Sequence, residues 1–194
     1  KAETIIPIYN PYEREPFVEL AREPTELPVG DYFICLAALE PRKRHDRLLR
    51  AYAASGTETP LVIMGKGKPE HEAKIRQQIE ELGLQDKVIM AGYHHNPYPW
   101  IAGAKAVILT SDAEGLPRVL IEALMLHVPV ISTDCPSGPR EILTGELASF
   151  LVAQEDEKGL ADAIKRMDQA PITIDESYYQ QFLTENVIPQ FEAL

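Results

Sequence analysis

One stretch of the chain, residues 106–132, constrains the fold more than any other. It begins with an apolar run at 106–109, and a polar loop then leads into a strongly helix-forming segment at 118–126. A second apolar run follows at 128–132. The order of strand, loop, helix and strand predicts one βαβ unit, whose two strands lie parallel in one sheet. Pro117 stands where the helix would begin, a position at which proline loses no hydrogen bond.

The same alternation recurs along the chain. Further apolar runs predict strands, and each is followed by a polar loop and a helical segment; they lie at 32–39, 61–64, 87–91 and 149–152. About six strands alternating with about six helices predict an α/β protein with a Rossmann-like, doubly wound parallel sheet. We expect an irregular lead-in over residues 1–30 with a short helix near 16–22, the main domain over 31–172 and a C-terminal helix over 173–194 that packs on the domain.

Composition excludes several classes of protein. The 194 residues, 45% of them hydrophobic, suit one globular domain. The net charge of −11 argues against a nucleic-acid partner. No apolar run approaches the roughly 18 residues of a membrane span, and no signal-peptide pattern is visible. We therefore expect a cytoplasmic protein in which Cys35 and Cys135 are free thiols.

Two carboxylates stand out in the central unit. Glu114 lies in the loop after the strand, and Glu122 lies inside the apolar helix, where a charge needs a partner or a ligand. One interpretation is an ordinary i, i+4 ion pair with Arg118. The other is a nucleotide-sugar site, in which the helix start binds phosphate, Glu122 binds ribose and Glu114 meets the sugar. The donor-contacting residues at this helix start would be Gly115, Leu116, Pro117, Arg118 and Val119.

Other loops after predicted strands also carry polar groups, and such loops meet at one edge of a parallel sheet. Arg42, Lys43 and Arg44 follow the first strand. They form either a solvated basic turn or a diphosphate site built on Lys43 with Arg42 or Arg44. Gly65 follows the second strand and predicts a tight turn with close backbone approach to a ligand or helix. The adjacent histidines after the third strand have no further metal ligands at suitable spacing, so we expect no metal site.

A family resemblance supports the nucleotide-sugar interpretation. The segments concerned read EGLP at 114–117, EAL at 122–124, PVI at 129–131 and CPSGPREIL at 135–143. They resemble the donor half of the group 1 (family 4) retaining glycosyltransferases, and this resemblance implies the C-terminal half of a GT-B fold. It also implies that the nucleobase lies near Tyr93 and His94 and that Lys43 contacts the diphosphate. Many relatives carry Gly-Arg where this chain has Ala37-Ala38, so Arg42 or Arg44 would replace that arginine.

The resemblance implies a function as well. We expect transfer of a hexosyl unit from a UDP- or GDP-sugar to a saccharide or lipid-linked acceptor, with Glu114 and Lys43 as catalytic residues and no metal or other cofactor. Residues 4–11 resemble the segment that enters the second domain of such enzymes. An absent first domain would then bind the acceptor, the last helix would cross to it, and this chain alone would be inactive.

Two other functions remain open at this point. One is a nucleotide-sugar epimerase of similar fold, and the other is a non-catalytic module that binds nucleotide sugars. For the intact enzyme the resemblance implies polysaccharide or lipopolysaccharide synthesis, with peripheral association at the inner face of the cell membrane.

Overall fold

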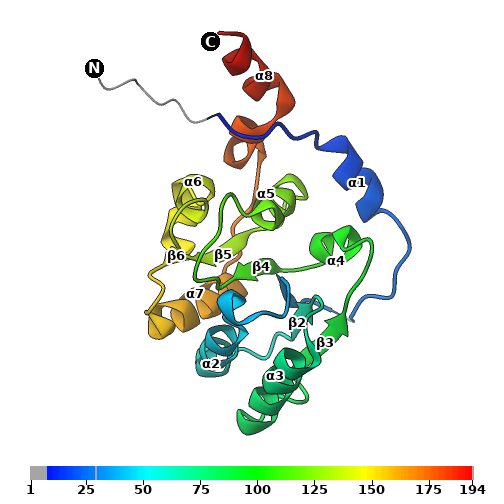
Figure 1. Cartoon of the computed structure of the whole chain (residues 1–194), viewed down its shortest axis with the longest axis vertical. Helices are drawn as coiled ribbons and strands as arrows, with labels where there is room; N and C mark the ends of the chain where they lie inside the picture. Colours follow the sequence, from blue (N-terminus) through cyan, green and yellow to red (C-terminus); the bar gives the residue numbers. More distant parts are fainter. Residues whose placement is uncertain (1–7, 29, 194) are drawn as a thin grey trace.

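The computed structural model of the chain describes residues 8–28 and 30–193. These residues form a six-stranded parallel sheet in the order β3-β2-β1-β4-β5-β6 (Figure 1). The strands are β1 (Phe33–Leu36), β2 (Leu61–Met64), β3 (Val88–Gly92), β4 (Ala106–Leu109), β5 (Val130–Thr133) and β6 (Leu151–Val152). The predicted fold class, a Rossmann-like doubly wound α/β sheet, is confirmed.

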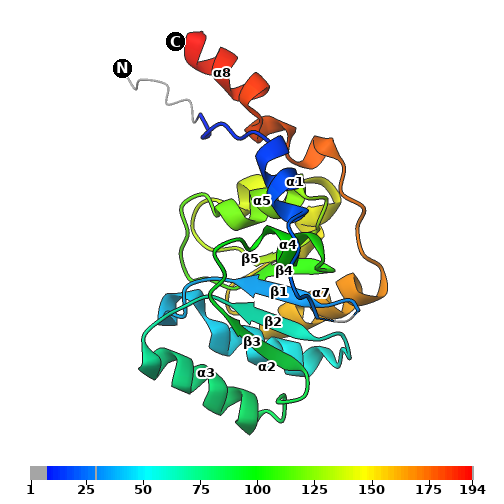
Figure 2. The same cartoon turned by 90° about the vertical axis from the view of Figure 1, so that its right-hand side faces the viewer.

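Helices cover both faces of this sheet (Figure 2). They are α1 (Glu15–Ala21), α2 (His45–Ser55), α3 (Pro69–Glu81), α4 (Tyr98–Ala102), α5 (Arg118–Met125), α6 (Pro139–Ile142), α7 (Glu157–Gln169) and α8 (Thr184–Glu192). Helix α2 packs against α3 and α7 on one face, whereas α5 and α6 pack together on the other, the face that α4 also covers. Within the described residues, no helix is long and apolar enough to cross a membrane.

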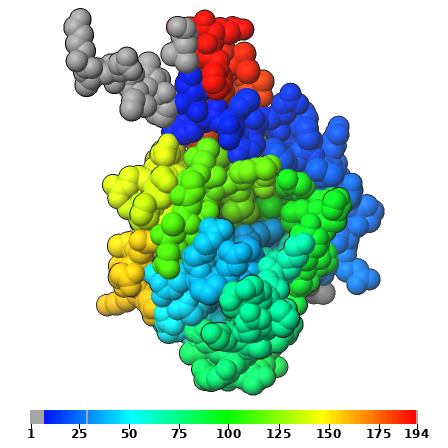
Figure 3. Space-filling model, viewed as in Figure 1, coloured from blue at the N-terminus to red at the C-terminus, as the bar shows by residue number. Residues whose placement is uncertain are grey.

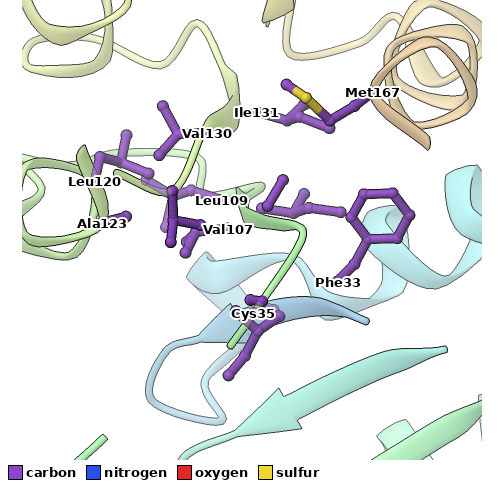
Figure 4. Close-up of a cluster of buried hydrophobic side chains, with 14 of the residues drawn as sticks. Phe33, Cys35, Val107, Leu109, Leu120, Ala123, Val130, Ile131 and Met167 are labelled. Carbon is purple, nitrogen blue, oxygen red and sulfur yellow. The ribbon is translucent and has the colours of Figure 1, made fainter. Parts of the chain in front are cut away.

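The core lies between these layers. Strands β2, β4 and β5 are buried at every position, as expected for strands that are covered on both faces. Leu120 and Ala123 of α5 point into one side of the core, and Met167 of α7 lies beside Ile131 on the other (Figure 4). Cys35 lies in this core and, like Cys135, is a free buried thiol, as predicted.

The strand order creates a crevice at one edge of the sheet. From β1 the chain first builds outward through β2 and β3, then crosses back to place β4 on the other side of β1. The loops after β1 and β4 therefore leave the same edge in opposite directions. In doubly wound sheets this reversal point is where ligands bind. The sheet thus brings the turn that carries Lys43 next to the loop that carries Glu114.

The C-terminal segment differs from its prediction, whereas the short helix predicted in the lead-in is present as α1. The helix expected over 173–194 is wrong in its first half, which forms the 3-10 turns Glu176–Tyr178 and Gln180–Phe182 before α8 begins. The first turn starts where the Asp175 carboxylate accepts a hydrogen bond from the Ser177 amide. The lead-in contains α1, and Tyr12 hydrogen-bonds Phe182 and Thr184 through the backbone. The lead-in and the C-terminal segment thus pack together at one end (Figure 3). Residues 4–7 of the domain-entry segment lie outside the described residues.

Smaller differences concern the ends of elements. Strand β1 stops at Leu36, short of the predicted 39, although Leu39 still forms an isolated parallel bridge with Gly67. Pro117 is the residue just before α5 and not its first residue, because its ψ of 98° is extended. Both differences lie at the ends of elements, where the hydrogen bonding that defines an element stops, and they leave the predicted sheet unchanged.

Candidate functional site

The centre of the candidate site is an ion pair between Lys43 and Glu114. The Lys43 Nζ lies 2.5 Å from the Glu114 Oε1, and each side chain is only 12% exposed. Ser111 donates a second hydrogen bond to the same carboxylate oxygen, at 2.6 Å. The pair joins the loop after β1 to the loop after β4 across the reversal point of the sheet. Two residues 71 positions apart in sequence, both proposed as catalytic, are thus brought into contact.

The loop that carries Glu114 is held close to the amino end of α5. Ser137 donates from its hydroxyl to the Glu114 carbonyl oxygen at 2.9 Å. Gly138, with φ of +90°, fits so tightly that a Cβ there would lie 2.0 Å from the Gly115 carbonyl oxygen and 2.5 Å from Pro117 Cδ. The segment 135–143 thus packs against the loop that carries Glu114.

The amino end of α5 is open to a ligand. Gly115 is exposed, and no side chain of residues 8–28 or 30–193 caps the first turn of this helix. Uncapped amides at a helix start favour anions through both hydrogen bonding and the helix dipole. The start of α5 thus has uncapped amides, and phosphate binding by residues 115–119 stays a prediction.

Glu122 is buried one turn into α5, with a residue exposure of 8%. Arg118, 69% exposed, lies 3.3 Å from its carboxylate, so the i, i+4 pair that the sequence suggested is present. Burial raises the pKa of Glu122 above its ordinary value, and the Arg118 charge only partly opposes this rise. Burial raises the pKa of Tyr98 and of Tyr12, and the Glu122 charge adds to the rise in both while Arg118 opposes it.

Glu114 and Glu122 therefore occupy different surroundings. Glu114 faces Lys43 at the carboxyl ends of the strands, whereas Glu122 faces Arg118 and the side of α4 and the lead-in. A ligand that touched both would have to span the amino end of α5, as an extended nucleotide sugar does.

A separate cavity lies beside the ends of β1, β2 and β3. It measures about 300 Å³, and its walls include Ala38, Lys66, Tyr93 and His94. Tyr93 is 60% exposed, with the Lys66 Nζ 4.7 Å from its ring centroid. His94 Nε2 lies 3.1 Å from the Ala91 carbonyl oxygen, and its ring packs 4.9 Å from that of Trp100. An exposed aromatic ring beside an apolar cavity suits a planar base.

Gly65 forms the floor of this cavity. A Cβ at this position would lie 1.9 Å from the Ala37 carbonyl oxygen, so Gly65 closely approaches the backbone after β1 and not a helix. The backbone after β1 and the backbone after β2 are therefore in close contact at the cavity. The approach of Gly65 to a ligand stays a prediction.

The basic turn after β1 divides its three cations among different partners. Lys43 forms an ion pair with Glu114, and Arg42 forms one with Glu40 at 3.0 Å, with the Arg42 side chain 55% exposed. Arg44 bonds Asp46 and Asp112, each at 3.0 Å. Both arginines are already paired, and their contact with a diphosphate stays a prediction. The solvated-turn interpretation therefore fits Arg42 better than it fits Lys43.

Two residues of this region were not predicted from the sequence. Lys66 lines the cavity next to Ala38, and Ser111 bonds Glu114. Lys66 lies between Gly65 and Gly67 directly after a strand, so its place at the carboxyl edge was a usable signal. No comparable signal marked Ser111, because a serine after a strand is common.

Within the described residues, no group of three or more His, Cys, Asp or Glu side chains is arranged to hold a metal.

Comparisons with known proteins agree with this fold. The family model for glycosyl transferases group 1 matches residues 19–178. The Campylobacter jejuni N-acetylgalactosamine-N,N'-diacetylbacillosaminyl-diphospho-undecaprenol 4-alpha-N-acetylgalactosaminyltransferase is 34% identical over 161 residues, 82% of this chain and 43% of that protein. The Escherichia coli lipopolysaccharide 1,6-galactosyltransferase is 29% identical over 194 residues, covering 92% and 53%.

Solved structures show the same architecture. TarM from S. aureus superposes with a TM-score of 0.79 at 20% identity, over 99% of this chain and 39% of that one. Anabaena HepE in complex with UDP gives a TM-score of 0.75 at 20% identity, over 96% and 56%. The fold is thus the Rossmann-like C-terminal half of the GT-B architecture. By sequence, the chain belongs to the group 1 glycosyltransferases. It spans about half or less of the length of these relatives.

Proposed function

We propose that this chain binds the nucleotide-sugar donor of a retaining glycosyltransferase that moves a hexosyl unit from a UDP- or GDP-sugar. The observation that carries the proposal is the partly buried Lys43–Glu114 pair, which lies at the reversal point of the sheet beside an uncapped helix start. A cation and free amides converging on one point are the groups that a diphosphate requires.

The chemistry assigned to each group follows from its position. When the sugar leaves the donor, negative charge develops on the departing diphosphate, and stabilising that charge lowers the barrier. Lys43 and the amides at the start of α5 supply this stabilisation. Glu114, adjacent to Lys43, orients the hydroxyls of the sugar, and the cavity beside Tyr93 accepts the base. This scheme needs no metal.

The remaining partners lie outside this chain. We propose a saccharide or lipid-linked acceptor held by a separate N-terminal domain, with α8 packed toward that domain. The names of the relatives support this class of acceptor, since one transfers to a diphospho-undecaprenol-linked sugar and another to lipopolysaccharide. The intact enzyme would then work in the cytoplasm at the inner face of the membrane, and this chain alone would bind donor without efficient transfer.

The ribose role of Glu122 gives a test of the binding mode. Glu122→Ala is expected to weaken binding of the preferred nucleoside diphosphate, UDP or GDP, by about tenfold or more, the value of a charge-assisted hydrogen bond. Calorimetry with the matching 2′,3′-dideoxy diphosphate is the control. The wild type should bind this analogue as weakly as the variant does, and the variant should bind both ligands equally. An unchanged affinity for UDP and GDP in Glu122→Ala would reject the ribose role and leave only the ion pair with Arg118.

A further inference from the structure

The turn that carries Lys43 is tied to the loop after β4 by hydrogen bonds to its backbone. The Thr110 hydroxyl, fully buried, lies 3.0 Å from the Lys43 carbonyl oxygen and 3.1 Å from that of Arg44. The Asp112 amide donates to the Arg42 carbonyl oxygen at 2.9 Å. Two donors of the loop after β4, the Asp112 amide and the Thr110 hydroxyl, thus lie within hydrogen-bonding distance of three successive carbonyl oxygens of the turn.

Arg47 hydrogen-bonds the loop after β4. Its side chain is only 1% exposed, and its guanidinium donates to the Thr110 carbonyl oxygen at 3.0 Å and to Asp112 at 3.1 Å. A third bond, at 3.2 Å, reaches Glu155, whose side chain is 89% exposed. Arg47 lies on α2, the helix that begins directly after the basic turn. The buried Arg47 side chain thus connects α2 to Thr110. Thr110 in turn contacts the Lys43 turn through its hydroxyl.

These contacts bear on the reach of Lys43. The Lys43 Nζ contacts the carboxylate of Glu114, which lies on the loop after β4. The position of the Lys43 ammonium group therefore depends on how the two loops are placed relative to each other. Arg44, which follows the turn, has φ of 51°, a left-handed conformation that non-glycine residues adopt only when their surroundings hold them. The Thr110 hydroxyl is one of the groups that hold it.

Stability alone does not explain a guanidinium buried to this degree. Desolvating a charge is costly, and replacing a buried ionic group by an apolar one of similar volume is often neutral for stability. What an apolar residue cannot reproduce is the direction of the bonds to Thr110 and Asp112. The geometry therefore favours a role in fixing the positions of the loops.

We propose that the Thr110 hydroxyl and the Arg47 guanidinium are positioning groups, which hold the Lys43 turn and the Glu114 loop at the separation that a diphosphate requires. This inference rests on the proposed function, since it assumes that Lys43 binds the diphosphate. Neither group touches the ligand. Both act through the backbone of the two loops.

Thr110→Val tests the inference because valine has the shape of threonine and lacks the hydroxyl. We expect about tenfold weaker binding of the nucleoside diphosphate, UDP or GDP, that the wild type binds best, with nucleoside binding changed less than about twofold. Thr110→Ser keeps the hydroxyl and should restore wild-type affinity. Calorimetry measures the diphosphate and NMR titration the nucleoside. A general packing defect would weaken both ligands alike and would not be rescued by serine.

A second variant and a reference separate the possible outcomes. Arg47→Met removes the bonds to Thr110 and fills a similar volume, so it carries the same test if the valine variant does not fold. If Lys43→Ala loses diphosphate binding selectively but neither variant does, the positioning role is wrong and the proposed function stands. If Lys43→Ala is not selective, or if the wild type binds neither UDP nor GDP, the proposed function fails and the inference falls with it.

Discussion

Replacing Lys43 with alanine is expected to lower the affinity of the chain for its preferred nucleoside diphosphate by about 10- to 100-fold, as for a lost hydrogen bond between charged groups. The reason is the position of its side chain, which is 12% exposed and places the Nζ 2.5 Å from the Glu114 Oε1. The substitution removes the ammonium group that would meet the phosphates. It also leaves a partly buried carboxylate that repels them. Binding of the nucleoside without phosphates should hardly change, because the cavity beside Tyr93 is untouched.

Calorimetry with the diphosphate and NMR titration with the nucleoside measure this difference. Lys165→Ala is the matched control, since it removes the same charge from an exposed position on α7, on the face of the sheet opposite α5. The control should retain wild-type affinity for both ligands, which shows that net charge is not the cause. Equal losses of nucleoside and diphosphate affinity in Lys43→Ala would contradict a diphosphate role.

Gly138→Ala is expected to cause the largest loss of stability, about 2–4 kcal/mol in the free energy of unfolding, as for a residue forced into a strained backbone with steric overlap. The added Cβ would lie 2.0 Å from the Gly115 carbonyl oxygen and 2.5 Å from Pro117 Cδ. Neither neighbour is the flexible end of a side chain. Relief of the overlap must displace the loop before α5, so diphosphate binding should weaken together with stability.

Gly56→Ala separates strain from overlap in this prediction. Gly56 also has a positive φ, +68°, but a Cβ there would meet no atom within 4 Å. It should cost only the left-handed backbone term of about 1–2 kcal/mol and leave ligand binding intact. Urea unfolding of both variants gives the comparison. Similar losses in the two variants would mean that the close packing of Gly138 under the loop has no energetic consequence.

The sheet was predictable from the sequence because its strands are short apolar runs with polar loops between them. Strands that are covered on both faces need apolar residues at every position, as in residues 61–64 and 106–109. The meeting of Lys43 with Glu114 was partly predictable, since both follow strands and so lie at one edge. Their adjacency depends on β1 pairing with β4, which no local pattern specifies.

Other features depend on contacts between distant segments and could not be read locally. The hydroxyl of Thr110 and the burial of Arg47 have no sequence signature, because a threonine after a strand and an arginine in a helix are both ordinary. The C-terminal segment was predicted as one helix from its apolar residues. The Asp175–Ser177 turn and the pairing of Tyr12 with Phe182 override that local preference.

A crystal structure of this chain with its preferred nucleoside diphosphate tests the proposed donor site most directly. We expect phosphate oxygens within hydrogen-bonding distance of the Lys43 Nζ and of the amides at the start of α5, with the base in the cavity beside Tyr93. A nucleotide bound elsewhere on the sheet, with the Lys43–Glu114 pair intact and the amino end of α5 untouched, would contradict it.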